Sequence, residues 1–284
     1  MVFRNGKIVA KQRNLLRKMK KIINLVLVLS FFCSCSEYQK ALKSEDVAVK
    51  FEMANQLYEA GKYAKAIRLF EEIAPAYRGK PQAEKMFYLF SQSYYKSQQY
   101  YLASYQFESF TSSYPKSEKV EEAAFLGAKS YSMLSPVYSI DQTDTTKAIS
   151  KLQEFIDMYP NSTYLAEANA DLKKLTDKIE KKVFENAKQY NTISDYKSAI
   201  VALDNFISDY PGTMYKDQAL FYKFDSAYKL AINSVPSKME ERLINAKVAY
   251  GNLTKNSENN EYKEKADEML AKIEKDLQQF TKIN

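Results

Sequence analysis

The chain has 284 residues, of which 45% are hydrophobic, and it holds only 6 Gly and 7 Pro. A chain of this length can bury a substantial core, and so few turn-forming residues argue against an all-β fold. The absence of histidine excludes His-based catalytic triads and HExxH-type zinc sites. The net charge of +7 comes from residues 1–34, since the remaining 34 Lys and Arg face 35 Asp and Glu. The main body therefore lacks the basic surface that nucleic-acid binding requires.

The N-terminal segment combines basic side chains with a short apolar run at residues 22–32. A membrane-spanning helix needs about 20 apolar residues, so this run is too short to span a bilayer. The run follows Met19-Lys20-Lys21 and ends in small residues, which predicts a secretory signal peptide over residues 1–34. Met19 is the natural start of such a signal, and we therefore expect residues 1–18 to be an overcalled start.

The predicted signal ends in Cys33-Ser34-Cys35, which resembles a bacterial lipobox, where a small residue precedes the cysteine that is acylated. We expect lipidation at Cys35. Its covalently attached acyl chains, such as palmitate, are the only cofactor expected, and no metal site is predicted. Several acyl chains give a stable anchor where one is marginal. Ser36 in place of Asp resembles outer-membrane sorting signals, and residues 35–46 are expected to form a short polar tether. Two alternatives remain, an ordinary secretory signal followed by a free cysteine and a thiol–disulfide pair.

Three later stretches share an alanine, a phenylalanine seven residues further on, and then a Tyr-Pro pair. These residues are Ala103, Phe110, Tyr114 and Pro115; Ala148, Phe155, Tyr159 and Pro160; and Ala199, Phe206, Tyr210 and Pro211. Residues seven apart lie on one helical face, and proline prevents the helix from continuing. Ser117, Ser162 and Thr213 lie two residues beyond each proline and are expected to be N-caps of the next helices.

A complete helical hairpin is predicted over residues 51–73, with Ala54 in its first helix, Gly61 in the turn, and Tyr63 and Phe70 in its second helix. This spacing resembles the tetratricopeptide pattern. Five helix pairs are expected near residues 47–78, 81–115, 117–159, 162–210 and 213–254. A final helix near 261–281 would cap the array, as solenoid ends require. The predicted fold class is all-α, a tetratricopeptide-like helical-hairpin solenoid of about five repeats plus a C-terminal capping helix, over residues 47–284.

The remaining sequence offers no catalytic constellation. Adjacent carboxylates occur at Glu71-Glu72, Glu121-Glu122 and Glu240-Glu241, but adjacent helical residues do not face each other. These pairs are therefore expected to lie on solvated helix surfaces. Tyrosines on the inner helices of the first two units, namely Tyr58, Tyr94 and Tyr95, are candidates for lining a groove that binds an extended peptide.

One block of the third predicted unit resembles the BamD (ComL) family of outer-membrane β-barrel assembly lipoproteins. The residues that carry this resemblance are Asp141, Gln142, Thr143, Thr146, Ala148, Phe155, Tyr159, Pro160, Asn161, Ser162 and Tyr164. The stretch from Ser194 to Thr213 resembles the family's fourth unit. One departure is Val183, four residues before Ala187, where many family members have a glutamate.

This resemblance implies a non-enzymatic scaffold, lipid-anchored on the periplasmic face of the outer membrane of a Gram-negative bacterium. The C-terminal units would hold the barrel-insertion outer-membrane subunit and other assembly lipoproteins, and the N-terminal units would receive unfolded outer-membrane proteins. One alternative is a different tetratricopeptide adaptor lipoprotein of the cell envelope. Another is a hydrolase or glycan-binding lipoprotein, which would need a cleft with perturbed carboxylates or exposed aromatic rings.

Overall fold

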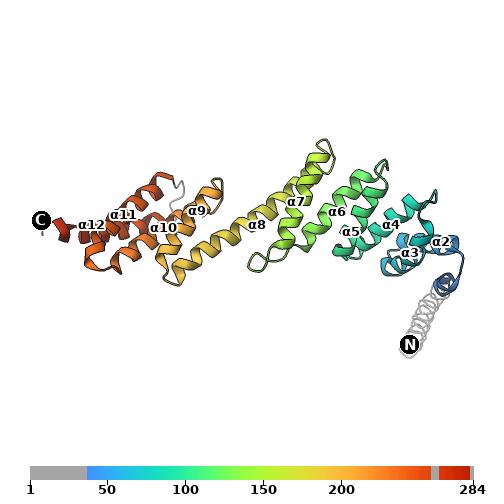
Figure 1. Cartoon of the computed structure of the whole chain (residues 1–284), viewed down its shortest axis with the longest axis horizontal. Coiled ribbons are helices and arrows are strands. Elements are labelled where there is room, and N and C mark those ends of the chain that lie inside the picture. Colours follow the sequence, from blue (N-terminus) through green and yellow to red (C-terminus); the bar gives the residue numbers. More distant parts are fainter. Residues whose placement is uncertain (1–36, 257–261, 282–284) are drawn as a thin grey trace, which may run out of the picture. The chain divides into compact units, whose positions relative to one another are not determined.

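The computed structural model describes residues 37–256 and 262–281, and in these residues all regular secondary structure is helical. The predicted signal peptide, Cys33 and Cys35 lie outside the described residues. The chain divides into two compact units, residues 1–130 and 131–284, and each is treated by itself below. The prediction of an all-α fold made of helical hairpins is confirmed (Figure 1).

Unit 1 consists of short antiparallel helices that pack in chain order. Its elements are a helical turn at residues 37–43, α2 (Val47–Glu59), α3 (Tyr63–Tyr77), α4 (Ala83–Lys96), α5 (Tyr100–Ser113) and the first part of α6 (Val120–Leu134), which continues into unit 2. Helix α3 packs against both α2 and α4, α4 packs against α5, and α2 also contacts α4. Fully buried Phe70, Phe107 and Phe110 fill the core between these helices.

The structure corrects the expected tether over residues 35–46. Residues 37–43 form helix, and Tyr38 and Ala41 are only 6% and 2% exposed. Tyr38 belongs to the same apolar cluster as Phe51 and Phe70. The physical reason is that Tyr38 and Ala41 lie three residues apart on one helical face. Two apolar residues at helical spacing are too few to be noticed in the sequence, yet they are enough to pack this short helix onto the core.

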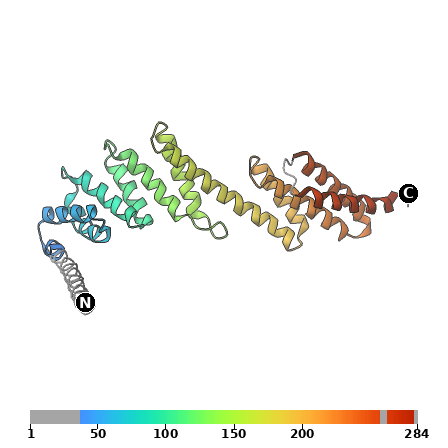
Figure 2. The ribbon, with the colours of Figure 1, turned by 180° about the vertical axis from the view of Figure 1, so that it is seen from behind.

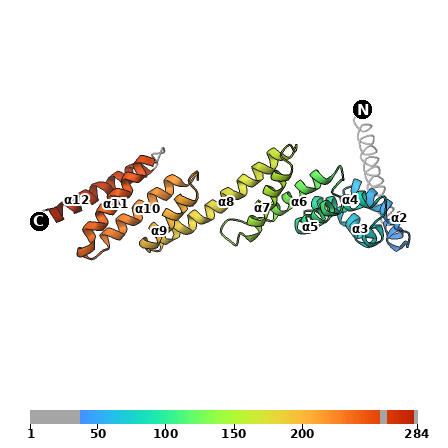
Figure 3. The same cartoon turned by 45° about the horizontal axis from the view of Figure 1, so that its top comes forward.

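Unit 2 contains longer helices. They are α7 (Thr143–Met158), α8 (Leu165–Thr192), α9 (Tyr196–Asp209), α10 (Lys216–Ile232), α11 (Pro236–Asn256) and α12 (Lys263–Thr281). The 28-residue α8, yellow in Figure 2, contacts α7 as well as α9 and α10. Helices α9 to α12 pack side by side, and α12 lies against α10 and α11 (Figure 3). The predicted final helix is therefore present and covers the end of the hairpin array.

The three Tyr-Pro stretches form nearly identical turns. In each, the tyrosine N–H donates to the carbonyl of the phenylalanine four residues before it, at 2.9, 2.9 and 3.0 Å. The two aromatic rings of each pair lie 5.3, 5.3 and 5.4 Å apart. The alanines and phenylalanines are buried, as predicted: Ala103, Ala148, Ala199, Phe110, Phe155 and Phe206. The repeated motif therefore works as a helix stop in which tyrosine covers the last turn before proline.

The prediction that Ser117, Ser162 and Thr213 are helix N-caps is wrong by about one turn. Each side-chain oxygen accepts a hydrogen bond from the N–H two residues later, at 3.0, 3.1 and 3.2 Å. The helices begin three residues after these positions, at Val120, Leu165 and Lys216. The hydroxyls thus stabilise the turn that leads into each helix, a role that Ser and Thr also perform through short-range backbone hydrogen bonds.

Candidate protein-binding surfaces

A cluster of polar and aromatic side chains lies on α2, α4 and the start of α6 in unit 1. Tyr58, Tyr88 and Glu122 are partly buried, Gln92 is buried, and Lys119 is exposed just before α6. Gln92 on α4 donates a 2.7 Å hydrogen bond to the Tyr88 hydroxyl one turn away. Tyr88 also hydrogen-bonds to the Glu122 carboxylate on α6. Lys119 pairs with Glu122 at 3.1 Å, and its ammonium lies 5.5 Å from the centroid of the Tyr88 ring. We call Tyr58, Tyr88, Gln92, Lys119 and Glu122 the tyrosine cluster.

Tyr58 on α2 belongs to this cluster through its electrostatics. Burial raises its pKa, and the nearby Tyr63, Glu59 and Glu122 raise it further. Burial, followed by the hydrogen bond with Glu122, raises the pKa of Tyr88 as well. Both phenols therefore remain protonated at neutral pH, where they can donate and accept hydrogen bonds. A phenol held so far from ionisation is unsuited to act as a general base.

The three tyrosines expected in a peptide groove have different positions. Tyr94 is only 4% exposed, and its hydroxyl donates a 2.6 Å hydrogen bond to Glu71 on α3. Its ring contacts Phe90 in the core, so the expectation that Tyr94 lines a groove is corrected. The physical reason is that α3 covers this side of α4, which the helical period alone does not reveal.

Tyr58 and Tyr95 have equivalent positions in successive hairpins. Each packs edge-on against the tyrosine that begins the next helix, Tyr63 or Tyr100, with both pairs of ring centroids 5.7 Å apart. Both rings are partly buried against the core of unit 1. Their role as peptide contacts remains a prediction, and Tyr58 is the stronger candidate because it shares the environment of Glu122 with Tyr88.

Sequence reasoning missed Tyr88 and also a second aromatic surface. Tyr101 and Tyr105 lie one turn apart on α5 and are 71% and 64% exposed. The sequence alone could not single out Tyr88, because the chain has 23 tyrosines. No neighbouring residue indicates which of these tyrosines another helix covers and which lie on an uncovered helix face. The packing of α4 against its neighbours decides this.

The block that resembles the BamD family has a clear structural role in unit 2. Gln142 is buried, and its amide donates to the carbonyls of Val137 and Ile140 at 2.7 and 3.0 Å. Its carbonyl accepts from Thr145 at 2.8 Å. The exposed Asp141 accepts a 2.9 Å bond from the Thr143 N–H, and hydrogen bonding by Thr143 lowers the Asp141 pKa. These residues close the loop before α7.

Lysines of α8 hold the same loop from the other side. Lys178 donates to the Ser135 hydroxyl at 2.6 Å and the Pro136 carbonyl at 2.8 Å. Lys182 donates to the carbonyl of Ile140 at 2.5 Å. Burial lowers the pKa of Lys178, and the neighbouring Lys174 lowers it further. Part of the charged face of α8 therefore holds the loop before α7.

The other residues of the block build the turn between α7 and α8. Tyr159 covers Phe155, and Ser162 accepts the N–H of Tyr164, the residue before α8 begins. Pro160 and Asn161 are exposed in this turn. At the departure from the family pattern, the Val183 side chain is partly buried and packs against the apolar cluster that contains Phe184.

Unit 2 has a partly open cleft between α9, α10 and α11, with a volume of about 270 Å³. Ile200, Leu230 and Val248 contribute apolar surface to it. The cations on its lining are already engaged, since Lys223 pairs with Asp204 and Arg242 donates to the Ser234 hydroxyl. A recess of this size and character suits an apolar side chain of a partner protein.

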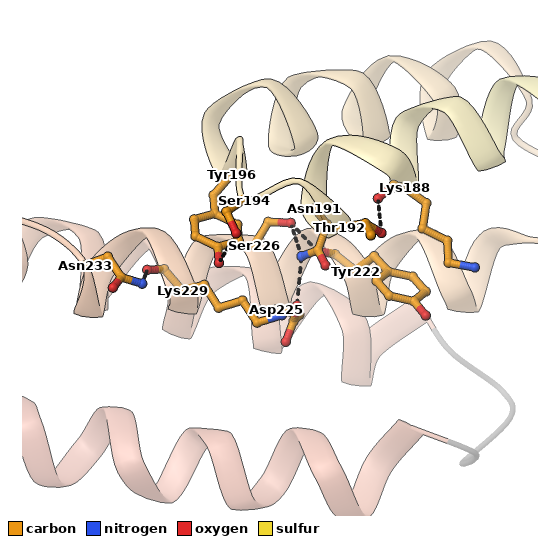
Figure 4. Close-up of polar contacts among 10 residues, drawn as sticks. All are labelled: Lys188, Asn191, Thr192, Ser194, Tyr196, Tyr222, Asp225, Ser226, Lys229 and Asn233. Carbon is orange, nitrogen blue, oxygen red and sulfur yellow. Dashed lines mark hydrogen bonds and ion pairs between the residues drawn. The ribbon is translucent and has the colours of Figure 1, made fainter.

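A buried polar contact joins α8 to α10, one of the helices that line this cleft (Figure 4). The Asn191 amide donates 2.8 Å bonds to both Asp225 and Ser226. Asp225 also pairs with Lys229 at 2.6 Å, one turn along α10. All three members of the first contact are buried and satisfied. The contact therefore fixes how α8 and α10 are aligned along each other, and the side chains of Asn191, Asp225 and Ser226 are all buried within it.

The described part of the chain shows no metal site or membrane span. Residues 37–256 and 262–281 bring together no group of three or more ligating side chains that could hold a metal ion. Within the same residues, no helix has the length and apolar character needed to cross a membrane.

The fold defines a helical-hairpin protein of the tetratricopeptide class. The chain belongs to the YfiO family of outer-membrane lipoproteins, whose family model matches residues 43–243. It is similar to the outer membrane protein assembly factor BamD of Haemophilus influenzae, at 20% identity over 236 residues, covering 80% of this chain and 90% of the relative. The resemblance to the BamD family is thereby confirmed.

Two solved structures of repeat proteins show weaker similarity. The TPR2AB domain of yeast Sti1, in a complex with pHSP90, has a TM-score of 0.36 at 14% identity, covering 80% of this chain and 98% of that chain. A putative Podospora anserina kinesin light chain with TPR-like repeats has a TM-score of 0.33 at 12% identity, covering 74% and 97%. Both scores are low, and the fold assignment rests on the chain's own helices.

Proposed function

We propose that this protein is a non-enzymatic scaffold, acylated at Cys35 and held on the periplasmic face of the outer membrane, that assists the assembly of β-barrel proteins. Family membership supports an outer-membrane lipoprotein, and the relative from Haemophilus influenzae is named an outer membrane protein assembly factor.

The observation that carries the proposal is the tyrosine cluster on α2, α4 and α6. Its two phenols are partly buried and lie beside aromatic rings, and the buried Gln92 amide holds the Tyr88 hydroxyl in place by a hydrogen bond. An extended segment of an unfolded outer-membrane protein presents backbone N–H and C=O groups together with aromatic and aliphatic side chains. Tyrosine suits such a ligand because it offers a rigid apolar face and a polar tip.

Unit 2 would hold the rest of the assembly machinery. The cleft between α9, α10 and α11 offers Leu230 and Val248 to an apolar side chain, and an anchor of this kind usually dominates an interface. The proposed partners there are the barrel-insertion subunit and other assembly lipoproteins. Affinity purification of the full chain from membranes tests this, since the barrel-insertion subunit should copurify. Recovery of peptidoglycan-associated proteins instead would favour the cell-envelope adaptor.

The substrate site is tested by removing single hydroxyls. Tyr88→Phe keeps the ring in place but deletes its hydrogen bonds with Gln92 and Glu122. Tyr58→Phe is the companion variant, and Tyr105→Phe removes an exposed hydroxyl from α5 as the matched control. Loss of one hydrogen bond should weaken binding of a fluorescent β-strand peptide from an outer-membrane protein by about five-fold. Equal affinities for all three variants would contradict the assignment.

A further inference from the structure

The described part of unit 1 begins at residue 37, two residues after the proposed acylation site. Residues 37–43 are helical, and Tyr38 and Ala41 are packed into the core. Two residues span at most about 7 Å even when fully extended. This inference rests on the proposed acylation of Cys35, whose acyl chains would lie in the hydrocarbon of the bilayer. Residue 37 would then lie within about 7 Å of the anchored cysteine, which is within reach of the lipid headgroups.

The surface next to this anchor point is basic. Lys40 and Lys43 lie three residues apart on helix 37–43, and both are exposed. The ammonium of Lys65 on α3 lies 5.1 Å from the centroid of the Tyr38 ring, which places α3 directly beside this helix. Lys62, the residue before α3, and Arg68 of α3 each lie three residues from Lys65. Side chains three residues apart lie on neighbouring positions of one helical surface.

Acidic side chains do not cancel this charge. Within residues 37–43 and 62–70 the one acid is Glu37, against five Lys and Arg. Among the acids that follow nearby, Asp46 caps α2 by accepting the Ala48 N–H at 2.8 Å, and Glu45 is exposed. Further along α3, Glu71 accepts from Tyr94 and Glu72 pairs with Lys50. These hydrogen bonds leave the carboxylates charged, so with Lys50 included six Lys and Arg face five acids over residues 37–50 and 62–72. The net charge beside the anchor is therefore slightly positive, and the cations are concentrated in residues 37–43 and 62–70.

We propose that Lys40 and Lys43, with Lys65 and Arg68 of α3, form a membrane-contact face that binds the phosphates of lipid headgroups. An anionic surface attracts each nearby Lys or Arg, and the effect fades within a Debye length. The acyl anchor holds these side chains inside that distance. Because Tyr38 is part of the core, the helix cannot swing freely, and unit 1 is held against the bilayer in a restricted range of orientations.

The experiment uses the full acylated protein in vesicles of phosphatidylethanolamine and phosphatidylglycerol. Gln39→Cys places a single labelling site on helix 37–43, since Cys33 would be removed with the signal peptide and Cys35 acylated. Tyr101→Cys places the same fluorophore on α5 of the same unit. A nitroxide on the lipid headgroup should quench the fluorophore at residue 39 and leave the fluorophore at residue 101 bright. Mass spectrometry of the same sample reports whether Cys35 is acylated.

A charge variant tests the phosphate contact. In the residue-39 background, Lys40→Gln with Lys43→Gln should lower the contact equilibrium by about 30-fold, since each lysine contributes about five-fold, and quenching should fall. Lys85→Gln with Lys96→Gln removes two exposed lysines of α4 as the matched control and should leave quenching unchanged.

The possible outcomes separate the two proposals. Acylated protein without quenching at residue 39, or with equal quenching at residues 39 and 101, overturns the membrane-contact face and leaves the acyl anchor intact. Quenching that is insensitive to the lysine substitutions overturns the phosphate contact. An unmodified Cys35 overturns both the anchor and the contact face.

Discussion

Asp225→Ala tests the buried contact between α8 and α10. Asp225 is 4% exposed, accepts from Asn191 at 2.8 Å and pairs with Lys229 at 2.6 Å. A hydrogen bond to a charged group contributes about 1.5–3 kcal/mol. The ion pair adds at most about 1 kcal/mol, because the Lys229 side chain is 38% exposed and can be rehydrated. The expected loss in the free energy of unfolding is therefore about 3 kcal/mol, dominated by the Asn191 contact.

Urea denaturation followed by circular dichroism measures this loss as a lower transition midpoint for unit 2. Asp225→Asn retains an acceptor for the Asn191 amide and loses only the ion pair, so its cost should be about 1 kcal/mol. A double-mutant cycle with Asn191→Ala should show a coupling energy of at least about 1 kcal/mol. Strict additivity in this cycle, or an Asp225→Ala variant as stable as the parent, would refute the account.

Four further changes have defined outcomes. Gln98→Gly should raise the melting temperature, because Gln98 has φ of 61° and a non-glycine residue there costs about 1 kcal/mol; a decrease would contradict this. Gln142→Leu should destabilise the loop before α7 by about 1–3 kcal/mol through unpaired carbonyls, seen as faster hydrogen exchange at residues 135–142. Ala148→Glu should unfold part of unit 2, since it puts a carboxylate at a fully buried position, while the exposed Ser150→Glu should melt like the parent. Cys35→Ala should release a folded protein from membranes in fractionation, and continued membrane association would count against acylation.

Much of the fold could be predicted from local patterns. The helix stops at the three Tyr-Pro stretches follow from proline itself, and their buried Ala and Phe follow from the helical period. The Gly61 turn is also local, since Gly61 has a positive φ of 69° that glycine adopts without strain. Two equivalent turns were harder to see, because Gln98 and Ser194 adopt the same conformation with φ of 61° and 64°.

The binding surfaces depended on contacts between helices. Tyr94 and Tyr95 are neighbours in the sequence, yet Tyr94 is covered by α3 while Tyr95 packs at the hairpin turn. Tyr88 gains its place in the tyrosine cluster from Gln92 on its own helix and Glu122 on α6. The lysines of α8 show the same dependence, because Lys178 reaches a loop more than forty residues earlier in the chain.

The sequence alone determined that this protein is a series of helical hairpins, because helix period, proline and glycine act within a few residues of where they stand. Only the tertiary structure decided that residues 37–43 are part of unit 1, that Tyr88 faces a polar cluster, and that Gln142 and Lys178 hold the loop before α7. Burial depends on which distant helix covers a given face, and that pairing is set by the packing of whole surfaces rather than by any single stretch of residues.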